Sequence, residues 1–174
     1  SGDLGGDDDP GTPVSLINGT FENGETGWTY TGTSYHGVDT NDAYEGSKYW
    51  IWGPNAYTAK VSQTVSGLEN GTYTVTAMVK QNTGTATVSR MELSGFGGNT
   101  VYTNIPHSSG YVQISGTANV TNGTLTISFY QEAPGDTNLQ IDNVVLTAGE
   151  TGSGDSGSGD LGGDDDPGTP VSLI

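Results

Sequence analysis

The alternation of apolar and polar residues is the strongest pattern in the chain. Tyr73, Val75, Ala77 and Val79 alternate with threonines and with Met78. This period of two residues is typical of a strand with one buried face. No stretch shows the apolar period of 3.6 residues that an amphipathic helix requires.

The same alternation returns along the chain, and turn signals separate its copies. Val61, Gln63 and Val65 share one face, as do the residues at 125, 127 and 129. The turn signals are Glu69-Asn70-Gly71, Thr83-Gly84, Gly97-Gly98-Asn99, Asn122-Gly123 and Ala133-Pro134-Gly135. About nine short strands with such turns predict an all-β fold, an antiparallel β-sandwich or jelly roll.

An exact repeat at the two ends sets the expected domain organisation. Residues 1–17 recur unchanged as residues 158–174. We expect a tandem array, with an acidic Gly/Asp linker at 1–13, one module at 14–148, an acidic Gly/Ser/Asp linker at 149–170 and the start of the next repeat at 171–174. The Asp-rich runs indicate either a self-repelling spacer or a joint stiffened by Ca²⁺.

The charge distribution narrows the expected partners. The net charge is −16, but residues 15–149 hold ten acids and four bases, so the body carries −6. Such a surface repels phosphate backbones and anionic lipids, so we expect no nucleic acid partner and no membrane insertion. No run of 18 apolar residues is present. The chain has no cysteine, which excludes disulfides and thiol chemistry.

Enzymatic chemistry has little support in the sequence. The two histidines, His36 and His107, have no metal-binding spacing, and no nucleophile elbow or phosphate loop occurs. A glycosidase needs two carboxylates across a cleft. The acids available for such a pair are few and unremarkable in spacing, so we expect a protein that is not an enzyme.

Aromatic residues are the better functional lead. In Lys48–Trp52, strand alternation places Trp50 and Trp52 on one face, with Tyr49 and Ile51 on the other. Either pair can fill the core. If Tyr49 and Ile51 do so, the two indoles point outward and present flat apolar area for the C–H faces of sugar rings.

Arg90 is the only arginine and lies in a predicted strand. A charge on a sheet face needs a partner. One interpretation is a structural salt bridge, and the other is a planar donor fork for the hydroxyl or carboxylate groups of a ligand.

Several stretches resemble jelly-roll carbohydrate-binding modules. The opening Leu16–Glu22 with Gly27-Trp28 is similar to their first strand, and Asn138–Val144 is similar to their last. A more specific resemblance, to the galactan-binding modules of family 61, covers roughly residues 15–147. It rests on Trp52, Tyr57, Gln63–Thr74, Gly97-Gly98, Asn104-Ile105-Pro106, Val120–Gly123 and Phe129-Tyr130.

The resemblance implies a jelly roll that binds β-1,4-linked galactose chains, with Trp52 as a stacking platform. Asn138 stands where that family carries an aromatic residue, and Trp50 stands where it has a smaller polar one, which points to a changed ligand. The expected ligand-binding residues are Trp52, Trp50, Tyr57, Arg90, Glu132 and Asn138.

The resemblance also implies a structural Ca²⁺ that ties the first strand to the last. The matching positions are Thr20 and Gly46 or Lys48, through their carbonyl oxygens, and the carboxylates of Glu22 and Asp142. Such oxygens are the ligands that Ca²⁺ prefers. The alternative is that Glu22 and Asp142 are exposed turn acids.

Together these patterns favour a non-catalytic module, outside the cell or on its surface, that binds a β-linked hexose polysaccharide such as β-1,4-galactan. Tandem copies raise avidity through effective concentration. The alternative is a structural repeat of a surface adhesin or extracellular filament. In that case the acidic linkers, or the strand Val171–Ile174 added to a neighbouring copy, mediate assembly.

Overall fold

The described part of the chain consists of strands and the turns between them. The structure is a computed structural model that describes residues 12–13 and 16–149. Its strands are β1 (Thr12–Pro13), β2 (Thr29–Gly32), β3 (Tyr35–Asp39), β4 (Lys48–Gly53), β5 (Tyr57–Ser66), β6 (Gly71–Lys80), β7 (Val88–Ser94), β8 (Val101–Asn104), β9 (Val112–Val120), β10 (Thr124–Ala133) and β11 (Thr137–Ala148). Within these residues no helix is long and apolar enough to cross a membrane.

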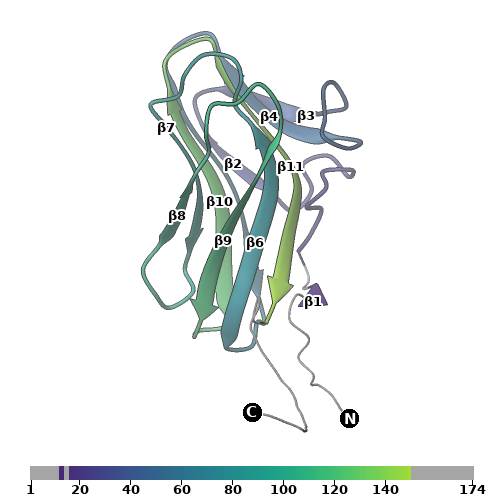
Figure 1. Cartoon of the computed structure of the whole chain (residues 1–174), viewed down its shortest axis with the longest axis vertical. Coiled ribbons are helices and arrows are strands. Elements are labelled where there is room, and N and C mark those ends of the chain that lie inside the picture. Colours follow the sequence, from purple (N-terminus) through teal and green to yellow (C-terminus); the bar gives the residue numbers. More distant parts are fainter. Residues whose placement is uncertain (1–11, 14–15, 150–174) are drawn as a thin grey trace, which may run out of the picture.

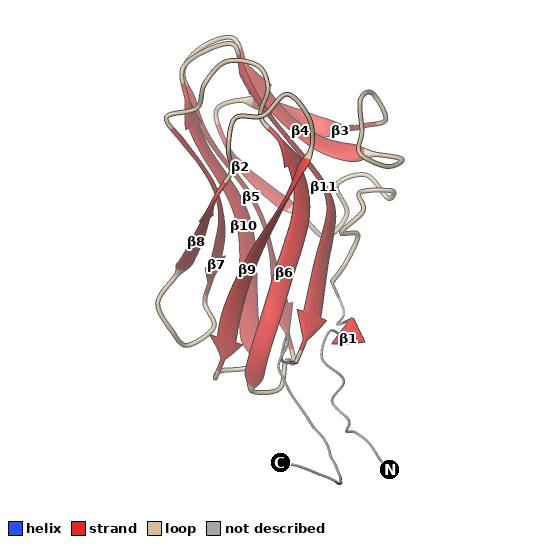
Figure 2. Cartoon of the chain, in the orientation of Figure 1, coloured by secondary structure: helices blue, strands red, loops and turns tan. Residues whose placement is uncertain are grey.

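The strands form two antiparallel sheets that face each other (Figure 1). The six-stranded sheet has the order β3-β4-β11-β6-β9, and β1 pairs with the far end of β11. The five-stranded sheet has the order β2-β5-β10-β7-β8. Figure 2 shows strands and loops only in the described chain. The predicted antiparallel β-sandwich is therefore confirmed.

β1 lies at the predicted boundary between the first linker and the module. β1 pairs Thr12 with Ala148 and Pro13 with Thr147, so these two residues of the predicted linker pair with the last strand. The other residues of the predicted linkers, 1–11 and 150–170, and the strand predicted at 171–174 lie outside the described residues.

Side-chain alternation builds the core as the sequence predicts. In β10, Leu125, Ile127 and Phe129 are completely buried, while Tyr130 on the opposite face is half-buried. The indole of Trp28 packs against Phe129, with ring centroids 6.2 Å apart. The two sheets thus share one apolar layer, which leaves the two outer faces as the surfaces on which a ligand can bind.

Candidate functional site

The two tryptophans of β4 lie on the outer face of the six-stranded sheet. Tyr49 and Ile51 are completely buried, whereas Trp50 and Trp52 are half-buried. The core therefore takes the tyrosine and the isoleucine, and both indoles point away from it. Of the two arrangements that the sequence left open, the structure has the outward one.

A row of side chains crosses the edge of this sheet at Trp52. The strand register pairs Tyr35 of β3 with Trp52, and Trp52 with Asn138 of β11. The Tyr35 and Trp52 rings are 6.3 Å apart and inclined by 16°. Tyr35 is 62% exposed. The indole Nε1 of Trp52 donates to Oδ1 of Asp136 at 3.2 Å, which holds the ring in a fixed orientation.

Trp50 lies in the next row and is flattened against the edge strand. Its cross-strand neighbours are Gly37 of β3 and Gln140 of β11. A Cβ atom at Gly37 would come within 3.2 Å of the indole. The absent side chain at Gly37 therefore lets the indole lie close over the backbone of β3. Tyr35, Trp52 and Trp50 together are called the platform below.

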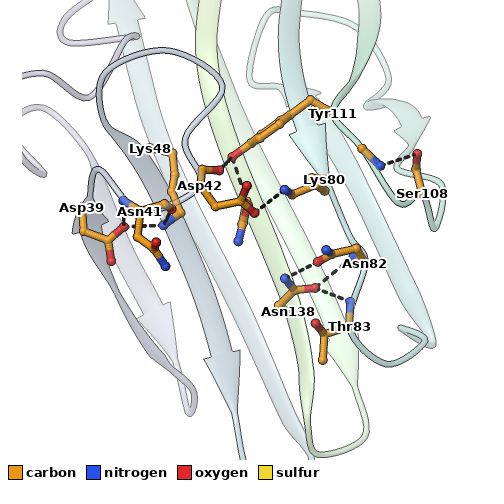
Figure 3. A network of polar contacts seen from close by, with 12 residues as sticks. Asp39, Asn41, Asp42, Lys48, Lys80, Asn82, Thr83, Ser108, Tyr111 and Asn138 are labelled. Atoms are coloured by element: carbon orange, nitrogen blue, oxygen red, sulfur yellow. Dashed lines mark hydrogen bonds and ion pairs between the residues drawn. The ribbon is translucent and has the colours of Figure 1, made fainter.

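Asn138 lies beside the platform, but most of its amide is engaged by the protein (Figure 3). Its Oδ1 accepts from the backbone N–H groups of Asn82 at 3.1 Å and Thr83 at 2.9 Å, and its Nδ2 donates to Oδ1 of Asn82 at 2.8 Å. The loop after β6 is thereby held next to the platform. The structure shows a positioning role for Asn138 that the sequence did not indicate.

Two buried lysines hold the loop between β3 and β4 on the same face (Figure 3). Lys48 contacts the carboxylate of Asp39, and Lys80 contacts that of Asp42. The ammonium group of Lys80 also lies 4.7 Å from the centroid of the Tyr111 ring. Burial raises the pKa of Tyr111, and the nearby carboxylates raise it further, so its hydroxyl stays protonated.

Tyr57 lies in the core and not beside the platform. It is 5% exposed, its hydroxyl donates to the carbonyl of Thr137 at 2.7 Å and accepts from Nε2 of Gln131 at 2.9 Å. The small area that Tyr57 exposes lines a hollow together with Glu132 and not the platform, so its ligand-binding role stays a prediction. Its burial follows from strand parity, because Tyr57 shares the buried face of β5 with Val61.

Arg90 and Glu132 lie on the other side of the molecule from Trp52. They belong to β7 and β10, and their side chains are on the outer face of the five-stranded sheet. Arg90 donates from Nε to Oε2 of Glu92 at 2.8 Å, which is the salt bridge that the sequence left open as one interpretation. The six expected residues therefore divide between two faces and the core.

Four of the five expected metal-binding positions meet in one pocket. The pocket has a volume of about 330 Å³, and Thr20, Glu22, Gly46 and Asp142 line it together with Glu45 and Asn143. Lys48 is not among its lining residues. Its side chain is buried against Asp39.

The carboxylates of the pocket are held by backbone donors. Oδ2 of Asp142 accepts from the N–H of Glu45 at 2.9 Å, and Oε2 of Glu22 accepts from the N–H of Ser47 at 2.6 Å. Gly46 has φ of +61°, and a Cβ atom there would collide with the carboxylate of Glu22. Glycine is therefore required there by both the backbone and the space.

Asp142 is 1% exposed and is not a turn acid in solvent. Burial raises its pKa, and the carboxylates of Glu22 and Glu45 raise it further, whereas its two backbone donors lower it. An uncompensated carboxylate in such a place is unfavourable, and a cation beside it would relieve the cost.

The donor set of this pocket fits a hard cation. Among residues 16–149, no group of three His, Cys, Asp or Glu side chains is close enough to hold a metal alone. A bound ion would therefore need backbone carbonyl oxygens in addition to the carboxylates. Calcium accepts such mixed oxygen sets with six to eight ligands.

Comparison with known proteins agrees with this fold. No family model matches the chain. One curated relative, a 1,6-alpha-glucosyltransferase from Sporosarcina globispora, is 33% identical over an alignment of 160 residues, and the match covers 79% of this chain. The chain spans only 12% of the length of that relative.

Solved structures of similar shape include several carbohydrate-binding modules. A family 61 module in complex with β-1,4-galactotriose has a TM-score of 0.67 at 20% identity, over 77% of this chain and 97% of that one. A family 22 xylan-binding domain from Paenibacillus barcinonensis has a TM-score of 0.55 at 17% identity, over 76% and 93%.

The enzymatically active domain of the bacteriophage CBA120 tailspike protein 4 has a TM-score of 0.63 at 17% identity, and the match covers 77% of this chain but only 21% of that one. The match covers nearly the full length of the two carbohydrate-binding modules, so they share the whole sandwich with this chain. In the tailspike, the match covers only one part of the protein. The chain has the jelly-roll fold of the β-sandwich carbohydrate-binding modules, as its resemblance to family 61 predicts.

Proposed function

We propose that this chain is a non-catalytic module that binds a polysaccharide on the outer face of the six-stranded sheet. The observation that carries the proposal is the platform. Its Tyr35 and Trp52 rings are nearly parallel, and Tyr35 is 62% exposed to solvent. Exposed aromatic rings kept rigid on strands suit the flat apolar faces of sugars.

The platform is ordered before a ligand arrives. Asp136 fixes the indole of Trp52 through its N–H, and Gly37 lets Trp50 lie against β3. Gln140 lies in the same row as Trp50, and its Oε1 accepts from the hydroxyl of Tyr111 at 3.0 Å, which orients its amide group beside the platform. Little side-chain freedom is lost on binding, which lowers the cost of forming the complex.

Two ligand classes have specific support. The sequence resemblance and the solved family 61 module with bound β-1,4-galactotriose favour a β-linked galactan. The similarity to a much longer 1,6-alpha-glucosyltransferase favours an α-glucan and a module that forms part of a larger protein. The repeated end sequences support a tandem arrangement, in which avidity strengthens weak single contacts.

We also propose that a Ca²⁺ ion is bound in the pocket of Glu22, Glu45 and Asp142. Its support is the buried carboxylate of Asp142 and the presence of the Glu22 and Glu45 side chains among the residues that line the same pocket. Bound there, the ion would supply positive charge only. It would connect the segment with Glu22, the β3–β4 loop with Glu45, and β11 with Asp142. Its role would be structural.

The rival function is a structural repeat of an adhesin or filament. Its support is the identical 17-residue sequence at both ends. The two functions differ in a simple measurement, because a structural repeat with a folded sandwich would not be retained by any glycan.

Replacing Trp52 by alanine is expected to weaken polysaccharide binding about 10- to 100-fold. Losing the burial of a large aromatic side chain costs about 1.5–3 kcal/mol, and 1.4 kcal/mol is tenfold in affinity. Affinity electrophoresis in gels with β-1,4-galactan, xylan, dextran or starch measures the retardation of the wild type and the variant.

Tyr44→Ala is the matched control, because Tyr44 is 47% exposed but lies on the β3–β4 loop and not in the platform. It should be retarded like the wild type. Equal retardation of Trp52→Ala and the wild type would exclude the platform, and no retardation in any gel with folded protein would favour the structural repeat.

A further inference from the structure

The edge strand β9 differs from the other edge strands of the two sheets. It ends the six-stranded sheet beside β6 (Figure 1) and runs over nine residues, Val112–Val120. The other described edge strands are shorter, and among them β1 contains Pro13 and β3 contains Asp39. A long edge without a charge or a proline offers unpaired backbone groups to a further strand, and proteins usually protect such an edge.

The sequence around β9 carries no acidic or basic residue over a long stretch. Residues 93–131 contain no Asp, Glu, Lys or Arg, although the whole chain has a net charge of −16. This stretch includes β8, β9 and most of β10. Two copies of an acidic protein repel each other over most of their surfaces, so an uncharged edge is where they can approach.

The backbone groups of alternate β9 residues point away from β6. In β6, the carbonyl of Thr72 accepts from the N–H of Gly149, which follows β11, so the even-numbered residues of β6 bond toward β11. The odd-numbered ones therefore bond toward β9, where Tyr73 lies opposite Ala118. Because backbone groups alternate between the two edges of a strand, the odd-numbered residues within 113–119 direct their N–H and C=O groups toward the free edge.

The neighbouring strand β8 of the other sheet leaves most of these groups unused. The hydroxyl of Thr103 donates to the carbonyl of Ser115 at 3.1 Å. That carbonyl keeps a second lone pair. Within residues 16–149, this is the one hydrogen bond to the backbone groups of 113–119 that face the free edge.

The sequence of β9 is chemically symmetric about Gly116. When two copies of the strand run antiparallel with Gly116 opposite Gly116, the residues that meet are of the same chemical kind. The pairs are Ser115 with Thr117, Ile114 with Ala118, Gln113 with Asn119, and Val112 with Val120. Pairing about a twofold axis uses the same surface of both copies, as the interface of a symmetric dimer requires.

The side chains that would meet on the outer face can bind one another. The exposed residues of β9 are Gln113, Ser115, Thr117 and Asn119, whereas the residues between them are buried. A hydroxyl then lies opposite a hydroxyl and an amide opposite an amide, and both kinds of pair exchange hydrogen bonds. The protein already contains such a pair, because Thr64 and Thr126 lie opposite each other and their hydroxyl groups are 2.8 Å apart.

We propose that β9 pairs with β9 of a second copy of this chain, antiparallel and with Gly116 on the twofold axis. The two six-stranded sheets then form one continuous sheet. Because the axis is perpendicular to this sheet, both outer faces, and so both platforms, point the same way. The strand order places β4 of the two copies about seven strand spacings apart, roughly 34 Å. The pairing needs no ligand, whereas its use in holding one polysaccharide at two points rests on the proposed function.

Sedimentation of the 174-residue chain without any glycan tests the pairing. A small polar interface forms a weak dimer, so the average mass should rise toward that of two chains between about 10 µM and about 1 mM. Thr117→Pro removes an N–H that faces the free edge and none that bonds to β6, and an edge strand tolerates proline at such a position. It should raise the dissociation constant about tenfold or more, because each dimer loses two hydrogen bonds.

Opposite charges test the register of the pairing. A variant with lysine at both Ser115 and Thr117 should not dimerise alone, and neither should one with glutamate at both positions. An equal mixture should dimerise, because each lysine then lies opposite a glutamate of the partner. Val145→Lys is the matched control, since Val145 is exposed in β11, away from β9, and this variant should dimerise like the wild type.

The outcomes decide the inference without reference to sugar binding. A wild type that stays monomeric at about 1 mM would overturn it, since that concentration detects weak interfaces. A dimer that a folded Thr117→Pro variant forms equally well would place the contact elsewhere and also overturn it. Failure of the lysine and glutamate variants to dimerise when mixed would contradict the twofold axis at Gly116. Circular dichroism shows whether each variant is folded.

Discussion

Replacing Phe129 by alanine is expected to lower the free energy of unfolding by about 3–5 kcal/mol. Phe129 is completely buried in the centre of β10, and its ring packs against that of Trp28 at 6.2 Å. The substitution removes a buried ring from a layer that both sheets share, and neighbouring strands cannot close the space. Urea unfolding monitored by tryptophan fluorescence measures the change.

Tyr102→Ala is the matched control for this prediction. It removes an aromatic ring of similar size that is 57% exposed, so we expect a loss below about 1 kcal/mol. Similar losses for the two variants would contradict the assignment of Phe129 to the core and of Tyr102 to the surface.

Calcium is expected to stabilise the protein by about 2.7 kcal/mol at a free concentration one hundred times its dissociation constant. For a domain of this size such a gain raises the unfolding temperature by on the order of 10 °C. The physical reason is the buried carboxylate of Asp142, which is repelled by Glu22 and Glu45 when no cation is near. Differential scanning calorimetry with EDTA and then with Ca²⁺ measures the shift.

Asp142→Asn keeps the shape of the side chain and removes its charge. The variant should lose most of the calcium-dependent gain, and Mg²⁺ should stabilise the wild type less because it needs a tighter octahedral set. An unfolding temperature that does not respond to millimolar Ca²⁺ would exclude a structural ion in this pocket.

The fold could be predicted because the alternation of apolar and polar residues shows which side chains of a strand face the core. Leu125, Ile127 and Phe129 alternate with polar residues and are all completely buried. The same rule places Tyr57 in the core, because it shares its parity with Val61 in β5 and is buried with it.

The composition of the site could be predicted only in part. The alternation along the strand predicts that Arg90 faces outward. It does not predict which sheet the strand joins, because strand pairing depends on contacts between segments that are distant in the sequence. The exposed Tyr102 was identifiable by alternation in β8, although nothing local showed that Arg90 lies over it. Asn138 donates a hydrogen bond to Asn82, and Glu45 lines the metal pocket. Both contacts depend on loop conformations that no short sequence pattern predicts.

The most direct test of the platform is a titration followed by the three indole N–H signals in ¹⁵N–¹H correlation spectra. Trp28 is 7% exposed and donates to the carbonyl of Asn18, so its signal serves as an internal reference. Addition of the oligosaccharide that binds should shift the signals of Trp52 and Trp50 to saturation and leave that of Trp28 in place. Saturating oligosaccharide that leaves the Trp52 signal unchanged would contradict the proposal that this face binds sugar.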